Sequence, residues 1–270
     1  RIFSRKTALG RDAKQSFVRD ASPGRRLGTS WRSRNVVMIA HTDRVREMNT
    51  DIVGTGATVT ITEIYKSVQG ESTWVGLPCI FVRLTGCNLR CVWCDTEYAF
   101  YGGNKMPVEE VVAECVALDC TLVEITGGEP LLQKHCGTLA QALLDRGFTV
   151  LCETSGALPI DRLPDAVIKI MDLKCPGSGE EEKNDWSNID RLSPRDEVKF
   201  VIADRADYEW SRDVVRKYDL AARCHQILFS PVFGPIEPKS MVEWILEDKL
   251  PVRFQLQLHK FVWPPDRKGV

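Results

Sequence analysis

The sequence lacks several features that would place it in specialised classes of protein. No apolar run in its 270 residues approaches the roughly 20 residues that a membrane-spanning helix needs. It has no internal repeat of fixed period, its formal net charge is only -1, and no fourth ligand for a structural zinc site is evident beside its cysteine cluster. These absences argue against a membrane-embedded protein and a zinc-binding module. With a hydrophobic content of 43%, they indicate a soluble globular chain with a substantial core.

The small net charge hides two segments of opposite charge. Residues 1–47 contain 12 Lys and Arg against 4 Asp and Glu, and residues 48–270 contain 24 against 33. The basic head has no sustained apolar period, so we expect it to be disordered. Its Arg-rich, acid-poor composition is typical of an organelle transit peptide and would also suit loose contact with nucleic acid. Because Met48 follows it, we interpret residues 1–47 as a misassigned start and expect no function there.

Three of the ten cysteines, Cys87, Cys91 and Cys94, form a CxxxCxxC run directly after an apolar, strand-like segment. Three thiolates from one loop can hold an iron–sulfur cluster and leave one iron open, whereas a structural zinc site takes four protein ligands. An open iron can bind a substrate or a cofactor. The other seven cysteines are expected to be small buried hydrophobes in a reducing cytosol: Cys79, Cys115, Cys120, Cys136, Cys152, Cys175 and Cys224.

Apolar, β-branched segments alternate with amphipathic segments through most of the remaining chain. Strands are expected at 57–65, 79–86, 121–126, 148–154, 167–174, 197–203, 226–230 and 253–258, and helices at 107–118, 135–147, 207–220 and 238–250. Nearly continuous apolar strands that alternate with helices are typical of a parallel sheet covered by helices. The sequence therefore predicts an α/β fold, a partial (β/α) barrel with helices covering a mostly parallel sheet.

Polar motifs follow the expected strands. The cysteine run follows one strand, and TGGEP (126–130), ETSG (153–156) and DLKCP (172–176) follow three others. Because the carboxyl ends of parallel strands meet at one edge of the sheet, we expect these motifs to surround a single opening at that edge, which we call the mouth. Gly127 and Gly128 would let a ligand approach the backbone closely, although paired glycines also make ordinary turns.

Four side chains near this mouth have both functional and structural interpretations. Glu153 and Asp172 could contact a ribose or an amine, or they could cap helices or pair with a lysine. Thr96 could offer its hydroxyl to a hard cation or cap a helix, and Asp95 is open to the same two interpretations.

The motifs resemble those of a known enzyme family. CNLRCVWC (87–94) resembles the cysteine signature of radical S-adenosylmethionine (SAM) enzymes, with Trp93 as the aromatic residue commonly found there, and TGGEP resembles their methionine-binding motif. A more specific resemblance, over most of residues 58–263, is to the 7-carboxy-7-deazaguanine synthases, which serve the biosynthesis of queuosine and other 7-deazapurines. It rests on SVQGE (67–71), FVRLTGC (81–87), WCDT (93–96), ITGGEP (125–130), ETSG (153–156) and QLHKF (257–261).

The resemblance implies ligands for a catalytic domain at residues 48–270. A 4Fe–4S cluster would be held by Cys87, Cys91 and Cys94, and Mg2+ by Thr96. SAM contacts are implied for Trp93, Cys94, Asp95, Gly128, Ser155, Asp172, Leu173 and Lys174, where Asp-Leu-Lys differs from the Ser-Pro-Lys of some members. Substrate contacts are implied for Val68, Gln69, Gly70, Glu71, Arg83, Thr126, Glu153 and His259.

The resemblance also implies a reaction and partners. Reductive cleavage of SAM would lead to hydrogen abstraction at C6 of 6-carboxy-5,6,7,8-tetrahydropterin. Rearrangement, ring contraction and loss of ammonia would give 7-carboxy-7-deazaguanine, with SAM regenerated. Electrons would come from a reducing partner such as flavodoxin or ferredoxin. A cytoplasmic homodimer without a membrane or nucleic-acid partner is expected.

Other functions remain open from the residues alone. An activating enzyme of a glycyl-radical protein would share the cysteine and glycine motifs, but it gives no reason for VQGE or the late HK. A non-catalytic iron–sulfur electron carrier would need no SAM-binding rim. Arg83 could simply form a buried ion pair, and His259 could be a structural hydrogen-bonding residue. Residues 263–265, Trp-Pro-Pro, are expected to fold the tail over the rim or to pack on the surface.

Overall fold

A computed structural model describes residues 56–270, so the basic head predicted at residues 1–47 lies outside the described residues. One mixed sheet runs through the described part, with strand order β3-β1-β2-β4-β5-β6-β7-β8-β9. The strands are β1 (Thr58–Val68), β2 (Pro78–Leu84), β3 (Asn104–Pro107), β4 (Leu122–Gly127), β5 (Thr149–Thr154), β6 (Ile168–Asp172), β7 (Glu197–Ile202), β8 (Gln226–Pro231) and β9 (Arg253–Phe254). Neighbouring strands from β2 to β9 are parallel, whereas β1 pairs antiparallel with both β2 and β3.

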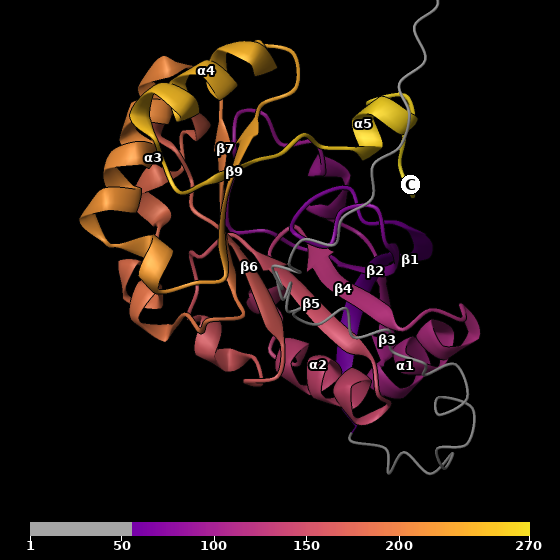
Figure 1. Cartoon of the computed structure of the whole chain (residues 1–270). Coiled ribbons are helices and arrows are strands. Elements are labelled where there is room, and N and C mark those ends of the chain that lie inside the picture. The colour runs from indigo at the N-terminus through magenta and orange to yellow at the C-terminus, as the bar shows by residue number, and fades with distance from the viewer. Residues whose placement is uncertain (1–55) are drawn as a thin grey trace, which may run out of the picture. The chain divides into compact units, whose positions relative to one another are not determined.

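Four helices lie along the outside of this sheet (Figure 1). They are α1 (Val108–Ala117), α2 (Cys136–Asp145), α3 (Arg205–Lys217) and α4 (Pro238–Asp248). Alternate strand residues such as Val82, Ile125 and Phe200 pack with these helices in the main core, because successive side chains of a strand point to opposite faces. None of the helices in residues 56–270 combines the length and apolar character that crossing a membrane requires.

A short fifth helix, α5 (His259–Val262), lies apart from the other four (Figure 1). Its Phe261 ring packs edge to face on Phe233 of the loop after β8, with 5.7 Å between ring centroids. Both rings are partly exposed. Beyond α5, the Nζ of Lys268 lies 4.3 Å from the centre of the Tyr98 ring, so the chain end returns toward the cysteine loop.

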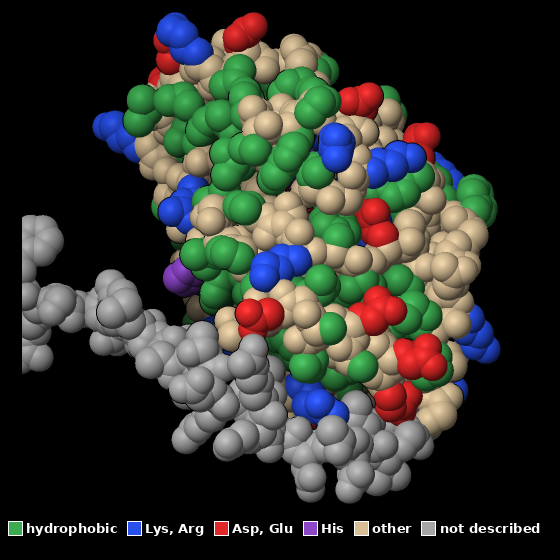
Figure 2. Space-filling model, turned by 90° about the vertical axis from the view of Figure 1, so that its right-hand side faces the viewer, with side chains coloured by type: hydrophobic (Ala, Val, Ile, Leu, Met, Phe, Trp, Pro, Cys, Tyr) green, Lys and Arg blue, Asp and Glu red, His purple; other side chains and the backbone are tan. Residues whose placement is uncertain are grey.

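The surface seen from the side carries charges of both signs, interspersed among hydrophobic side chains that gather in its upper part (Figure 2). Inside, six of the seven cysteines expected to be small buried hydrophobes are buried, and Cys120 is half-buried.

The predicted α/β fold, with helices on a mostly parallel sheet, is confirmed. One local prediction was wrong and one strand was missed. The strand expected at 253–258 ends at Phe254, because Gln257 and Leu258 turn away and bond to the loop after β1. Strand β3 was not predicted, since NKMP carries no β-branched residue; its strand form comes from pairing with β1.

Candidate active site

The face of the sheet opposite the four helices becomes polar toward the carboxyl ends of the strands. Near the amino ends this face is apolar, with Cys79, Leu122 and Ile170 in a second, smaller core. Two or four residues further along these strands, alternation brings charged and polar side chains to the same face. These side chains are Arg83, Glu124, Thr126, Glu153, Asp172 and Lys199. The single mouth predicted from the strand-end motifs therefore has a polar lining.

The loop after β1 and the C-terminal segment meet at this mouth. The amide of Leu258 donates to the carbonyl of Gly70 at 2.9 Å, and Nε2 of Gln257 donates to Oε1 of Glu71 at 3.0 Å. A Cβ on Gly70 would collide with the His259 ring, lying 3.1 Å from its Cγ, so any larger residue here would require that ring to move. The structure thus brings together the predicted substrate residues from Val68 to Glu71 and His259.

Gln69 reaches from the same loop into the sheet. Its side-chain amide donates to Glu124 on β4, and both residues are buried. Burial and the nearby Glu153 raise the pKa of Glu124 well above its ordinary value, which favours the neutral acid. Thr126 lies two residues further along β4 on the same face, and its hydroxyl donates to Oε2 of Glu153 at 3.4 Å. Glu124 was missed by the sequence analysis, although a lone acid in the apolar run LVEIT was its signal.

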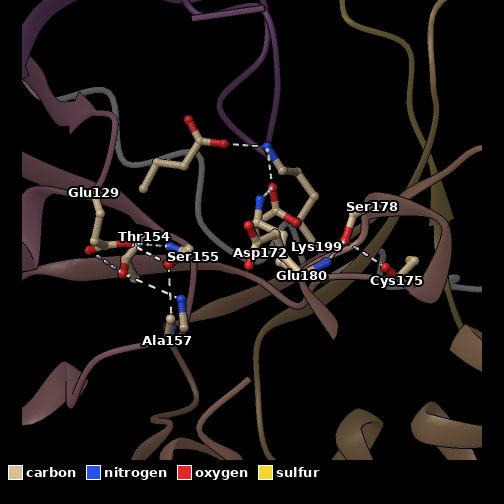
Figure 3. A network of polar contacts seen from close by, with 12 residues as sticks. Glu129, Thr154, Ser155, Ala157, Asp172, Cys175, Ser178, Glu180 and Lys199 are labelled. Carbon is tan, nitrogen blue, oxygen red and sulfur yellow. Dashed lines mark hydrogen bonds and ion pairs between the residues drawn. The ribbon is translucent and has the colours of Figure 1, made fainter. Parts of the chain in front are cut away.

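Lys199 on β7 was also missed, and it is the ionic centre of the mouth (Figure 3). Its Nζ lies 2.9 Å from Oε2 of Glu71 and forms an ion pair with Glu153. A third carboxylate, that of Asp172, lies 3.7 Å away. Burial alone would lower the pKa of Lys199, but the three carboxylates raise it well above its ordinary value, so the lysine is charged.

The guanidinium group of Arg83 on β2 is hydrogen-bonded to side chains of β1. Its Nε donates to Oε1 of Glu63 at 2.7 Å, and Nη2 donates to the Tyr65 hydroxyl at 3.1 Å. The Tyr98 hydroxyl donates to the same glutamate oxygen at 2.8 Å. The structure therefore contains the ion pair that the alternative interpretation anticipated, and contact of Arg83 with substrate stays a prediction.

The cysteine loop begins after β2, and its three thiols are partly buried. The amide of Cys94 bonds the Cys91 carbonyl at 3.2 Å, which forms a turn between them. Burial raises the pKa of Cys91 to about 11, while the cation of Lys174 opposes this rise. No group of three His, Cys, Asp or Glu side chains within residues 56–270 is arranged as a metal site in the structure. Ligation by these cysteines stays a prediction.

The end of the cysteine loop is tied to α5. Oδ2 of Asp95 lies 2.7 Å from Nζ of Lys260, and the Thr96 hydroxyl donates to Oδ1 at 2.8 Å. Burial would raise the pKa of Asp95, but Lys260 lowers it to about 2. Thr96 precedes a short 3-10 helix at Glu97–Ala99 without a side-chain cap, so its hydroxyl serves Asp95. Lys260 was not predicted as a site residue, although it belongs to the late HK pair.

The glycine motif packs directly on the start of the cysteine loop. A Cβ on Gly128 would lie 2.6 Å from the Cβ of Cys87 and would also collide with the Gly86 carbonyl. The next residue, Glu129, was missed by sequence analysis and is fully buried. Its carboxylate accepts bonds from the amide and hydroxyl of Ser155, at 2.7 and 2.6 Å, and from Thr154 and Leu131 (Figure 3). Glu129 thus joins the ends of β4 and β5.

The end of β6 supplies the last predicted contacts. Oδ2 of Asp172 pairs with Nζ of Lys174 at 2.8 Å, whereas Oδ1 is buried without a hydrogen-bond partner among the described residues. The side chain of Leu173 packs in the main core, and its backbone amide donates to the Lys199 carbonyl on β7 at 2.9 Å. Trp93 lies half-buried in the cysteine loop. The pairing of Asp172 with Lys174 is the structural alternative raised by the sequence.

Comparison with known proteins identifies the family. Residues 81–248 match the model of the radical SAM superfamily. A 7-carboxy-7-deazaguanine synthase of Koribacter versatilis is 50% identical over 224 residues, which cover 78% of this chain and 99% of the relative. The chain belongs to the 7-carboxy-7-deazaguanine synthase family. The synthase of Chlorobaculum tepidum is 46% identical over 221 residues, covering 81% of this chain and 100% of the relative.

A solved structure shows the same fold. The crystal structure of QueE from Escherichia coli superimposes with a TM-score of 0.62 at 22% identity, covering 75% of this chain and 95% of that one. The family resemblance inferred from the motifs is confirmed by the superfamily match and by the two synthase relatives. Nothing in these similarities supports an activating enzyme of a glycyl-radical protein or a non-catalytic electron carrier.

Membership of the radical SAM superfamily implies a 4Fe–4S cluster and SAM as cofactors. The residues at the mouth fit these groups. Three partly buried thiols stand on one loop, which suits a cluster with one open iron. The space that a Cβ on Gly128 would fill lies against that loop, and the unpartnered Oδ1 of Asp172 is a buried acceptor for a donor group.

Proposed function

We propose that this synthase converts 6-carboxy-5,6,7,8-tetrahydropterin into 7-carboxy-7-deazaguanine and ammonia. The observation that carries the proposal, beside family membership, is the junction of the VQGE loop with the C-terminal segment. The bond from Leu258 to Gly70 sets both segments over the mouth that the cysteine loop also borders. Segments with no role in holding a cluster or SAM are thus available to bind a second small molecule there.

The chain's own residues bind and orient the two molecules. The Glu71 and Glu153 carboxylates and the backbone of Gln69 and Gly70 would accept and donate hydrogen bonds along the pterin ring, with His259, Thr126, Arg83 and Val68 beside them. When bound, the cluster and SAM supply the hydrogen abstraction that starts the rearrangement. The ion pair between Lys260 and Asp95 ties helix α5 to the cysteine loop, and a helix held there would limit the access of water to the reacting groups.

We assign the cofactor contacts to the other side of the mouth. Cys87, Cys91 and Cys94 would ligate the cluster, and Gly128 would lie along the methionine part of SAM. The remaining SAM contacts would come from Trp93, Asp95, Ser155, Asp172, Lys174 and the backbone of Leu173. Thr96 would ligate Mg2+, which orients the substrate carboxylate. In the cell, we propose a cytoplasmic homodimer that receives electrons from a flavodoxin or ferredoxin.

Anaerobic reconstitution tests the proposed reaction. The purified chain is treated with iron and sulfide and then given reductant, SAM, Mg2+ and the carboxytetrahydropterin. We expect a 4Fe–4S cluster by absorbance and iron analysis, and 7-carboxy-7-deazaguanine by mass spectrometry. A cluster without this product would contradict the proposed reaction and leave the superfamily assignment intact. Absence of both, from folded protein, would also contradict the cluster assignment.

A further inference from the structure

Lys199 draws together segments that are distant in the sequence. It contacts Glu71, in the loop after β1 and 128 residues away, and Glu153 at the end of β5, 46 residues away. The lysine side chain is only 4% exposed. A buried ammonium group with two carboxylates in contact has little freedom to move, because leaving any of these charges unpaired is strongly destabilising.

We propose that Lys199 is a positioning residue, which holds the side chains of Glu71 and Glu153 in place to accept hydrogen bonds from the N–H groups of the substrate. This inference rests on the proposed function and deepens it. Sequence motifs did not indicate Lys199, and the comparisons assign no role to it. It acts through the two glutamates and needs no contact with the substrate.

The acceptor positions left open in the network match a ligand rich in N–H donors. An ionised carboxylate only accepts hydrogen bonds, and each has about four acceptor positions. Lys199 takes one oxygen of each glutamate, Oε2 of Glu71 and Oε1 of Glu153. The second oxygen of each glutamate already accepts one bond, from Gln257 to Oε1 of Glu71 and from Thr126 to Oε2 of Glu153. The proposed pterin carries an amino group and ring N–H groups, so its donors are complementary to the remaining acceptor positions. A lysine that neutralises part of the negative charge also reduces the cost of burying a neutral substrate there.

Other charged groups face this network from every neighbouring element. Lys174, which follows β6, pairs with Asp172 at the end of that strand. Lys199 is the largest cause that lowers the pKa of Glu71, and His259 of α5 is the next. Burial acts in the opposite direction on Glu71, and the lowered pKa is the balance of these effects. The titratable groups around Lys199 are Glu71, Glu124, Glu153, Asp172, Lys174 and His259. Among these groups, Lys199 is the cation that contacts both Glu71 and Glu153, the two glutamates proposed to bind the substrate.

Removing the lysine charge is expected to change the pH dependence of substrate use. In K199M, Glu71 stays buried near Glu153 without its main counter-ion, so the pKa of Glu71 rises. Activity that needs the ionised Glu71 is then lost at a higher pH. We expect the acid limb of kcat/KM to move up by about one to three pH units. KM at neutral pH should rise about tenfold with a smaller change in kcat, and K199R should restore the acid limb.

Lys169 provides a matched control. It is a second buried lysine, 6% exposed, paired with Asp196 at 3.6 Å near the amino end of β6. K169M removes the same charge from the same sheet at a distance from the mouth. It should lower stability while leaving the acid limb and KM unchanged. An equal shift in K169M, or an unmoved acid limb in K199M, would overturn the proposal.

A second variant and a second readout remove dependence on folding and turnover. K199M/E153Q removes one charge of each sign and keeps Glu71 without its lysine, so its residual activity should show an acid shift in the same direction if K199M does not fold. In denaturant unfolding, wild-type stability rises as pH increases through the ordinary Glu71 pKa of 4.5, because the folded pKa is lower. Either variant should show a smaller rise than wild type, because the other carboxyl groups with lowered pKa, such as Asp95, keep their share of it. A rise as large as that of wild type would contradict the inference. Wild-type protein that forms no product would contradict the proposed function alone, since unfolding still reports on Lys199 and Glu71.

Discussion

Replacing Cys91 with alanine is expected to reduce product formation to background, a loss of more than about 10³-fold. The cysteine loop offers three thiols for one cluster, and removing one leaves too few ligands to hold it with a single open iron. Iron and sulfide analysis after anaerobic reconstitution should show the loss directly. Because Cys91 is only partly buried, the alanine should leave the fold intact, which the circular dichroism spectrum checks.

Cys120 is the matched control for this change. It is also half-buried, and its Sγ lies 3.2 Å from the Pro78 carbonyl, at the end of β2 opposite the cysteine loop. C120A should assemble the cluster and form product at the wild-type rate. A C91A protein that still holds a complete cluster and remains active would refute the assignment of this cysteine.

Replacing Gly128 with alanine is expected to reduce kcat/KM by about 10²-fold, since displacement of reacting groups by about 1 Å is enough for such a loss. The added Cβ would meet the Gly86 carbonyl and the Cβ of Cys87, and neither can swing away as a long side chain would. The loop that carries Cys87 must therefore move away from the end of β4. SAM binding by the reconstituted protein, measured by equilibrium dialysis, should weaken in parallel.

A second glycine separates this local effect from a general loss of stability. Gly147, after α2, has a φ of +81° and no atom within 4 Å of an added Cβ. G147A should cost roughly 1 kcal/mol of stability through backbone strain, measured by denaturant unfolding. Its cluster content and SAM affinity should not change. If G128A binds SAM as tightly as wild type, the methionine-binding role of this glycine is wrong.

The strand ends were predictable from the sequence because parallel strands fix which ends of the segments meet. Apolar runs located β2, β4, β5 and β6, and their carboxyl ends carry Cys87, Gly128, Glu153 and Asp172 to one edge. The family motifs added the VQGE loop and His259, which the structure places side by side. Whether these side chains contact substrate and cofactor stays a prediction.

The ionic network was not predictable in the same way. No local pattern reports that Lys199 meets Glu71, because the contact forms only when β7 and the loop after β1 pack together. A charged residue between apolar neighbours in EVKFVI was the available signal, and it was interpreted only as part of a strand. Glu129 was overlooked for a related reason, since its four hydrogen bonds come largely from the end of the next strand, at Thr154 and Ser155.

The most direct measurement follows deuterium from C6 of the carboxytetrahydropterin during turnover. The cysteine loop, the glycine motif, the VQGE loop and α5 are placed around one mouth, so SAM and substrate should bind there in contact, shielded from water. We predict that the label passes into SAM and that little is lost to solvent. Product formation with unlabelled SAM, or with the deuterium recovered in water, would contradict a single shared site.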